Sequence, residues 1–141
     1  MNNENLKKAI MLLGKTDSTC VFCSNDAILT DKRRGVRPLL DLLDNQVDVS
    51  QYAVADKVIG KAAAFLYCLL RVTNIYARVI SQPALDVFKN SGITITYDQL
   101  VPAIQNRTKD GFCPMESAVL SISSPQEALI AIKETLAALS K

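Results

Sequence analysis

The stretch ADKVIGKAAAFLYCLLRV, residues 55–72, decides how the rest of the chain is interpreted. From Ala62 to Leu70 it carries no charged residue on any side, which indicates a helix that is buried all round at the centre of a domain. The charged residues stand before this apolar run. We therefore predict a long central helix from Asp56 to about Arg71, with Asp56 as its N-cap.

The first turn of this predicted helix carries two lysines. Lys57 and Lys61 are four residues apart, so they share one face of a helix. Cations at a helix N-terminus oppose the macrodipole by about 0.3–1 kcal/mol each, and a bound anion would reverse that sign. Gly60 would let backbone or ligand approach closely. The sequence thus predicts a ligand site formed by these three residues and Asp56; alternatively, both lysines point into water or pair with Asp56 and Asp48.

Helices and strands alternate on both sides of this stretch. Strand patterns cover residues 19–24 and 27–31, joined by the turn signal Asn25-Asp26, and then residues 74–81 and 93–97. Helical patterns cover residues 4–14, 37–45, 82–92, 114–120 and 125–141, the last opened by a capping box of Ser124, Pro125 and Glu127. Strands separated by helices predict an α/β protein whose mixed sheet is covered on both faces.

Length and composition limit the class of protein. The chain has 141 residues, enough for a single domain over residues 1–141 with its own core. It is 49% hydrophobic and 21% charged, and its net charge of +2 is too small to indicate nucleic-acid binding. The apolar run of the central helix is about half of what crosses a bilayer, and no signal-peptide cleavage site follows the first residues. We expect a soluble, cytoplasmic protein that binds neither nucleic acid nor membrane.

The four cysteines are expected as thiols, because no secretory signal accompanies them. Cys20 and Cys23 form a C-x-x-C, yet they lie in a predicted strand, where a spacing of three sends them to opposite faces. The chain has no histidine and no second C-x-x-C, which disfavours a zinc or redox pair. We expect no metal and no cofactor.

The stretch KDGFCPMESAV, residues 109–119, holds a second candidate site. Cys113, Pro114 and Glu116 fit the N-cap, N1 and N3 positions of a helix, where a thiol would feel the helix dipole. A nucleophilic cysteine needs a base, and in a chain without histidine Glu116, Asp110 or a lysine would have to serve. Two interpretations stay open: Cys113 is a cap at the edge of the ligand site, or it is a catalytic residue for which Glu116 handles protons.

Two basic segments are candidates for contacts with the phosphate of a ligand. The polar loop QNRTKDG, residues 105–111, supplies Arg107, which we assign to the ligand site. The turn DKRRGVR, residues 31–37, is a secondary candidate with four cations: Lys32, Arg33, Arg34 and Arg37.

Four segments resemble a small bacterial family of unknown function placed within the cytidine deaminase-like fold: GVRPLLDLL (35–43), ADKVIGKAAAFL (55–66), GITITYDQLVPAIQNR (92–107) and DGFCPMESAV (110–119). The resemblance covers nearly the whole chain. It implies a three-layer α/β/α sandwich with a mixed sheet of about four or five strands, and it places the helix opening at Asp56 where deaminases open their first zinc helix. Zinc deaminases need Cys or His ligands and a proton-shuttling glutamate at two helix starts, and neither predicted start here supplies them. We therefore expect no zinc-dependent deamination.

Three hypotheses about function follow. In the first, the domain binds a phosphate-bearing small molecule, a nucleotide or ADP-ribose-like compound, with Lys57, Lys61 and Arg107 around the anion. In the second, it is a metal-free enzyme with Cys113 as nucleophile. Lys57 or Lys61 would position the substrate, and Glu116 or Asp56 would handle protons. In the third, it is an oligomerising interaction protein, because the apolar helix over residues 125–139 could pack on a neighbouring copy. A helix that lies on its own sheet would show the same stripe.

Overall fold

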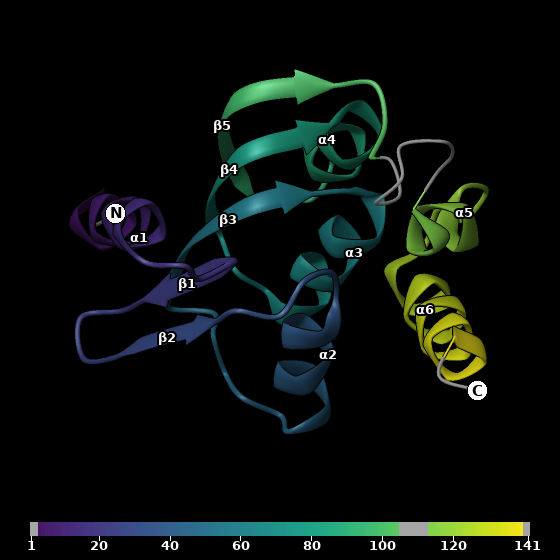
Figure 1. Cartoon of the computed structure of the whole chain (residues 1–141), viewed down its shortest axis with the longest axis horizontal. Coiled ribbons are helices and arrows are strands. Elements are labelled where there is room, and N and C mark those ends of the chain that lie inside the picture. The colour runs from purple at the N-terminus through teal and green to yellow at the C-terminus, as the bar shows by residue number, and fades with distance from the viewer. Residues whose placement is uncertain (1–2, 105–112, 140–141) are drawn as a thin grey trace.

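A five-stranded mixed sheet runs through the middle of the protein (Figure 1). The structure is a computed structural model that describes residues 3–104 and 113–139. The strands are β1 (Cys20–Cys23), β2 (Ile28–Asp31), β3 (Ala53–Ile59), β4 (Asn74–Ser81) and β5 (Thr94–Val101). The helices are α1 (Asn3–Lys15), α2 (Arg37–Asp44), α3 (Lys61–Leu70), α4 (Gln82–Lys89), α5 (Pro114–Val119) and α6 (Pro125–Leu139).

The strands follow the order β2-β1-β3-β4-β5 across the sheet. β1 pairs antiparallel with both β2 and β3, whereas β3, β4 and β5 are parallel to one another. The β1–β2 hairpin was predicted, and its turn is closed by a hydrogen bond of 2.9 Å from the Ser24 N–H to the Ala27 carbonyl. The prediction of an α/β protein with a mixed sheet is confirmed.

The prediction of a helix from Asp56 is wrong at its start. Residues Ala53–Ile59 form β3, the central strand of the sheet, in which Asp56 lies opposite Cys20 on β1 and Ala77 on β4. Helix α3 begins only at Lys61, after Gly60 in an extended conformation at the N-cap position. Asp56 is therefore not an N-cap. Lys57 lies on a strand and does not share a helical face with Lys61.

Physical signals for β3 are present in the sequence. Val54, Val58 and Ile59 are β-branched, which favours a strand, and Gly60 interrupts a helical pattern. A strand that is paired on both sides gains two ladders of backbone hydrogen bonds. These long-range pairings outweigh the helical tendency of residues 55–59.

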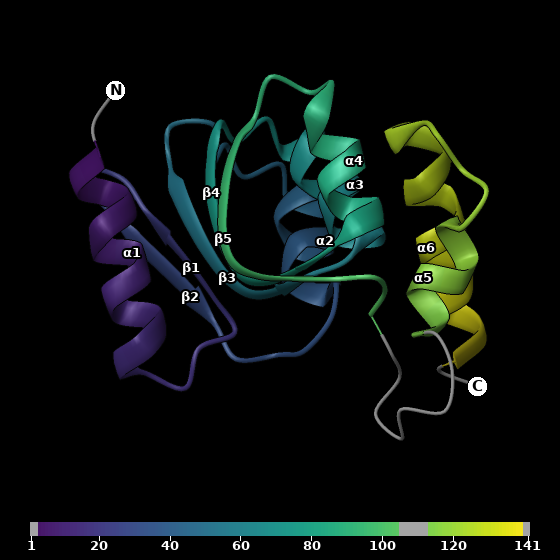
Figure 2. The same cartoon turned by 90° about the horizontal axis from the view of Figure 1, so that it is seen from above.

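The helices lie on both sides of the sheet (Figure 2). α1 packs on β1 and β3 on one side, while α2 and α4 pack against α3 on the other. α5 and α6 contact α3 in turn and lie farther from the sheet. The core under α1 is small, with these buried members: Ala9, Leu13, Val21, Cys23, Ala55 and Tyr76.

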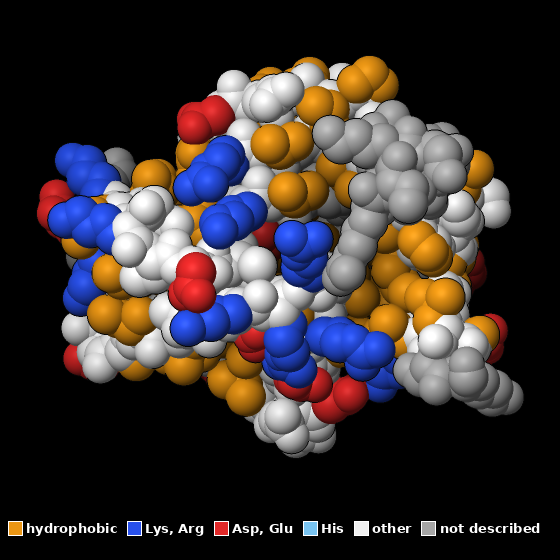
Figure 3. All heavy atoms as spheres, viewed as in Figure 1, with side chains coloured by type: hydrophobic (Ala, Val, Ile, Leu, Met, Phe, Trp, Pro, Cys, Tyr) orange, Lys and Arg blue, Asp and Glu red, His pale blue; other side chains and the backbone are white. Residues whose placement is uncertain are grey.

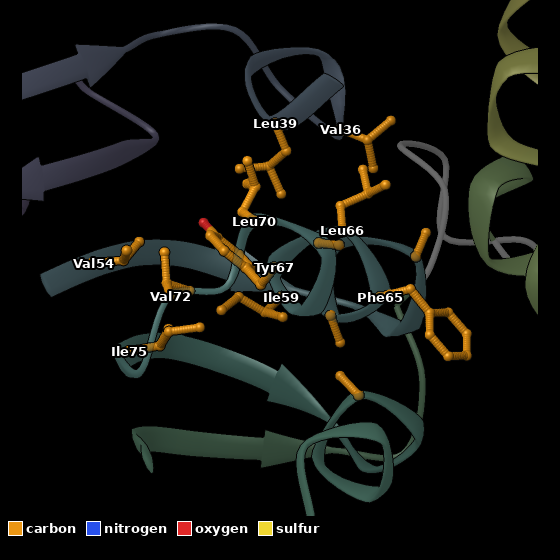
Figure 4. Packing of buried hydrophobic residues seen from close by; sticks show 14 of the residues in the cluster. Val36, Leu39, Val54, Ile59, Phe65, Leu66, Tyr67, Leu70, Val72 and Ile75 are labelled. Carbon is orange, nitrogen blue, oxygen red and sulfur yellow. The ribbon is translucent and has the colours of Figure 1, made fainter. Parts of the chain in front are cut away.

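Helix α3 is the centre of the larger core, as the sequence predicted. Every residue from Ala62 to Tyr67 is buried. In Figure 4 Leu66 and Leu70 point towards the segment of Val36 and Leu39, and Tyr67 points towards β3. Burying a leucine fully stabilises the fold by about 1.5–3 kcal/mol, so this helix carries a large share of the core.

The remaining sequence predictions for the fold concern cysteines and the last helix. All four cysteines are free thiols, and Cys20 and Cys23 belong to the cores on opposite sides of the sheet, as predicted. The Ser124 hydroxyl caps α6 by accepting a hydrogen bond from the Glu127 N–H at 3.4 Å. The buried face of α6 packs on α3 and α5 of the same chain. Among the helices described, none is long and apolar enough to cross a membrane.

Candidate functional site

A cavity of about 770 Å³ opens where β3 ends and α3 begins. Its walls come from the start of β1, the residues before and in the first turn of α2, the second half of β3, the first turn of α3, Ile104 and the start of α5. The polar side chains among the lining residues are Thr19, Arg34, Asp56, Lys57 and Glu116, together with the thiols of Cys20 and Cys113. Several Lys and Arg side chains gather across the centre of the face shown in Figure 3.

The N-terminus of α3 is occupied by a carboxylate of the same chain. Glu116 accepts hydrogen bonds from the backbone N–H groups of Lys61, at 2.7 Å to Oε1, and Ala62, at 2.9 Å to Oε2. A carboxylate at this place satisfies two of the free N–H groups of the helix start and complements the positive end of its dipole. The first turn of α3 therefore already holds its anion.

Gly60 makes this contact between α3 and α5 fit. A Cβ atom at residue 60 would lie 2.3 Å from Oε1 and 2.6 Å from the Cδ atom of Glu116. Any larger residue would push the carboxylate away from the N–H groups that it caps. The sequence predicted a close approach at Gly60, and the group that approaches is the side chain of Glu116.

Lys61 also ties α5 to α3. Its Nζ donates a hydrogen bond of 3.0 Å to the carbonyl of Leu120, the residue after α5, and lies 5.7 Å from the ring centroid of Phe65. Lys61 is not among the residues that line the cavity. The structure therefore does not bring the side chains of Lys57 and Lys61 together at the cavity.

Two other cations do line the cavity. Lys57 on β3 is half-buried, and Arg34 lies in the basic turn before α2. Neither forms an ion pair with any residue of 3–104 or 113–139. In contrast, the neighbouring Arg33 pairs with Asp31 at 2.8 Å and Asp41 at 2.6 Å.

Asp56 on β3 is one of the polar residues that line the cavity. Its carboxylate accepts a hydrogen bond of 2.6 Å from the Tyr67 hydroxyl and one of 3.2 Å from the Val58 N–H. Burial raises the pKa of Asp56 to about 6, although both hydrogen bonds act in the opposite direction. The carboxyl group can therefore change its charge near neutral pH. Burial, with the nearby Asp56 and Asp31, raises the pKa of the Cys20 thiol, which makes it a poor nucleophile.

Cys113 stands at the N-cap position of α5, as predicted, with Pro114 at the helix start. Its side chain makes no capping hydrogen bond, and the half-buried thiol lines the cavity. Both oxygens of the Glu116 carboxylate accept hydrogen bonds from α3. Arg107 lies outside the described residues.

Sequence reasoning missed parts of this arrangement. Tyr67 was assigned only to the core, and Arg34 was one of four equivalent cations in its turn. The contact of Glu116 with Lys61 spans 55 positions of the sequence. A helix-dipole argument indicates that an anion is favourable at α3, but it does not say which residue supplies it.

These features define an α/β protein with a five-stranded mixed sheet and a ligand-sized cavity at the carboxyl end of its central strand. The family described as "Domain of unknown function (DUF1893)" matches residues 8–136, so the chain belongs to the DUF1893 family. The crystal structure of a DUF1893 family protein from Thermotoga maritima is similar, with 28% sequence identity and a TM-score of 0.86. The similarity covers 97% of this chain and 91% of that protein. Among curated proteins, none matches the chain.

Proposed function

We propose that the cavity binds a phosphate-bearing small molecule, a nucleotide or an ADP-ribose-like compound, with the phosphate held by Lys57 and Arg34. The observation that carries this proposal is a cavity of about 770 Å³ lined by two cations that have no carboxylate partner among the described residues. Small-molecule sites have volumes of about 300–1,000 Å³. Basic side chains with free donors are the groups that recognise phosphate oxygens.

The position of the cavity supports the same proposal. In α/β proteins ligands bind beyond the carboxyl ends of the strands, and this cavity lies at the carboxyl end of β3. Its wall also holds apolar side chains, among them Val36, Leu39 and Met115, which suit the flat ring of a base. Asp56 would then face the polar edge of that ring, and its charge state would depend on pH.

We further propose that the scaffold is a three-layer α/β/α sandwich of the cytidine deaminase-like kind that works without zinc. α1 on one side of the sheet and α2 to α4 on the other support the layered arrangement. At its true start α3 presents Gly60, Lys61 and Ala62, and α4 presents Ser81, Gln82 and Pro83. None of these six residues is a usual zinc ligand, and the chain has no histidine.

A thermal-shift panel tests the binding proposal. Nucleoside mono-, di- and triphosphates and dinucleotides should raise the Tm of the wild-type protein, whereas the matched nucleosides without phosphate should raise it much less. A ligand at about 100 times its Kd stabilises the folded state by about 2.7 kcal/mol, which is readily measured as a shift in Tm. The absence of a shift with every phosphate compound would remove the proposal.

A metal-free enzyme with Cys113 as nucleophile is the alternative, because this thiol lines the same cavity. Glu116 or Asp56, which line the same cavity, would have to accept its proton. Iodoacetamide separates the two: rapid alkylation of Cys113 at neutral pH, blocked by a bound nucleotide, supports the enzyme. A thiol that reacts no faster than Cys68, which is also half-buried, supports the binding protein.

A further inference from the structure

The two edges of the sheet differ in length and protection. β2, at one edge, has four residues, and the side chain of Asp31 at its end is engaged by Arg33. β5, at the other edge, has eight residues, most of them exposed. Figures 1 and 2 show no other described helix or strand beyond β5.

The backbone of β5 presents unpaired hydrogen-bonding groups to solvent. The Thr94 N–H donates a hydrogen bond of 2.8 Å to the Thr73 carbonyl, so Thr94 faces β4 with its backbone groups. Because these groups alternate along a strand, those of Thr96 also face β4, while those of Ile95 and Tyr97 point away from the sheet. The alternation holds as far as Tyr97 and is interrupted at Asp98, which has no partner in the ladder to β4. Within residues 3–104 and 113–139, no backbone partner lies on that outer side.

β5 also lacks the features that keep strand edges apart. It contains no proline and no lysine, and Asp98 is its sole charged residue. The Asp98 carboxylate accepts a hydrogen bond from the Tyr76 hydroxyl of β4, which holds it on the face of the sheet. Tyr97 and Leu100 are 41% and 42% exposed. A long, exposed edge with a single charged residue is a template for another strand.

We propose that two copies of this chain associate by antiparallel pairing of their β5 edges around a two-fold axis at Tyr97. In this register Tyr97 faces its own copy, and each Thr96 faces Asp98 of the other chain, so a hydroxyl donor meets a carboxylate. A two-fold axis at Asp98 would instead place two carboxylates opposite each other, which is unfavourable. The sheets of the two copies would continue into one another. This interface is independent of the proposed ligand site.

The site of association differs from the one that the sequence suggested. The buried face of α6 is already used, because Ala128 and Ile132 pack within the chain. Ile130 of α6 is 60% exposed, which makes it a matched position on the alternative surface.

Sedimentation equilibrium tests the interface. The wild-type protein should be a dimer at micromolar concentrations, Tyr97→Lys should shift it to a monomer by placing two cations at the axis, and Ile130→Lys should remain a dimer. Far-UV circular dichroism confirms that each variant is folded. A monomeric wild type, or a dimer that survives Tyr97→Lys and dissociates with Ile130→Lys, would overturn the proposal.

Oxidative cross-linking tests the register in a second way. Opposed residues in a hydrogen-bonded antiparallel pair have Cα atoms about 5.5 Å apart, within the range of a disulfide. Tyr97→Cys should therefore cross-link with its own copy. Gln99→Cys should not, because the two Gln99 positions are about 14 Å apart at ~3.4 Å per residue. Cross-linking of Gln99→Cys but not Tyr97→Cys contradicts the register, and the wild type reports the background of the native thiols.

Discussion

The first turn of α3 and the wall of the cavity that carries Lys57 and Arg34 lie close together. They differ in whether a carboxylate of the same chain neutralises their positive charge. At α3 the N–H groups of Lys61 and Ala62 are bound by the carboxylate of Glu116. On the wall, Lys57 and Arg34 have no carboxylate partner among the described residues. A helix N-terminus beside a cavity is therefore not by itself a ligand site, since the chain can supply its own anion.

The comparison also separates two roles for neighbouring lysines. Lys61 stabilises the contact between α3 and α5, because its ammonium group donates to the Leu120 carbonyl. Lys57 contributes its charge to the cavity. From their spacing in the sequence the two lysines were expected on one face of a helix. In the structure β3 ends between them, so Lys57 lies on a strand and Lys61 on a helix.

The largest expected effect on stability concerns the contact between Glu116 and the first turn of α3. Glu116→Ala should lower the free energy of unfolding by about 2–3 kcal/mol, because two partly buried N–H groups lose a charged acceptor. Gly60→Ala should cost a similar amount by displacing the same carboxylate. Urea denaturation measures both, and Glu134→Ala on the exposed face of α6 is a control expected within about 0.5 kcal/mol of the wild type.

A double-mutant cycle sharpens this prediction. If Gly60 serves only to admit Glu116, adding Gly60→Ala to Glu116→Ala should cost little more than Glu116→Ala alone. Fully additive losses would show that Gly60 has another role and that the carboxylate is not the group it accommodates.

The next largest effect concerns Asp56, which lines the cavity, and the pH dependence of stability. Its pKa of about 6 in the folded protein exceeds its ordinary value of 3.8, so between these values the folded state holds a proton that the unfolded state has released. The contribution of Asp56 to the free energy of unfolding should therefore fall by about 2–3 kcal/mol as pH rises from about 4 to 6. Asp56→Asn should lose this dependence. Chemical denaturation at pH 4, 5, 6 and 8 provides the measurement, and identical pH profiles for both proteins would contradict the raised pKa.

The smallest effect is expected at Cys113. Its thiol makes no capping hydrogen bond, so Cys113→Ser should change the free energy of unfolding by less than about 0.5 kcal/mol. The same variant should bind nucleotide as the wild type does. A loss of binding larger than tenfold would show that the thiol contacts the ligand.

Elements with local signals could be predicted from the sequence. The hairpin of β1 and β2 follows from its turn residues, and α6 from its cap at Ser124. α4 begins after Ser81, whose hydroxyl accepts a hydrogen bond from the Ala84 N–H at 3.2 Å. In each case the residues that determine the structure are within a few positions of one another.

Elements that depend on distant partners could not be predicted in this way. β3 is a strand because β1 and β4 pair with it. Its local signals, the β-branched Val58 and Ile59 followed by Gly60, do not by themselves separate it from the helix that follows. The capping of α3 by Glu116 depends on how α5 docks after the sheet is complete. The general region of the candidate site was found from Asp56, Lys57 and Cys113, but the partners of its charges were not.

The most direct test of the difference between the first turn of α3 and the wall of the cavity is a calorimetric titration of Lys57→Ala and Lys61→Ala. The titrant is the phosphate compound that stabilises the wild type most in the thermal-shift panel. We predict that Lys57→Ala raises the Kd about tenfold or more, equivalent to about 1.4 kcal/mol, and that Lys61→Ala changes it less than about threefold. A Kd that rises with Lys61→Ala and stays at the wild-type value with Lys57→Ala would contradict the account.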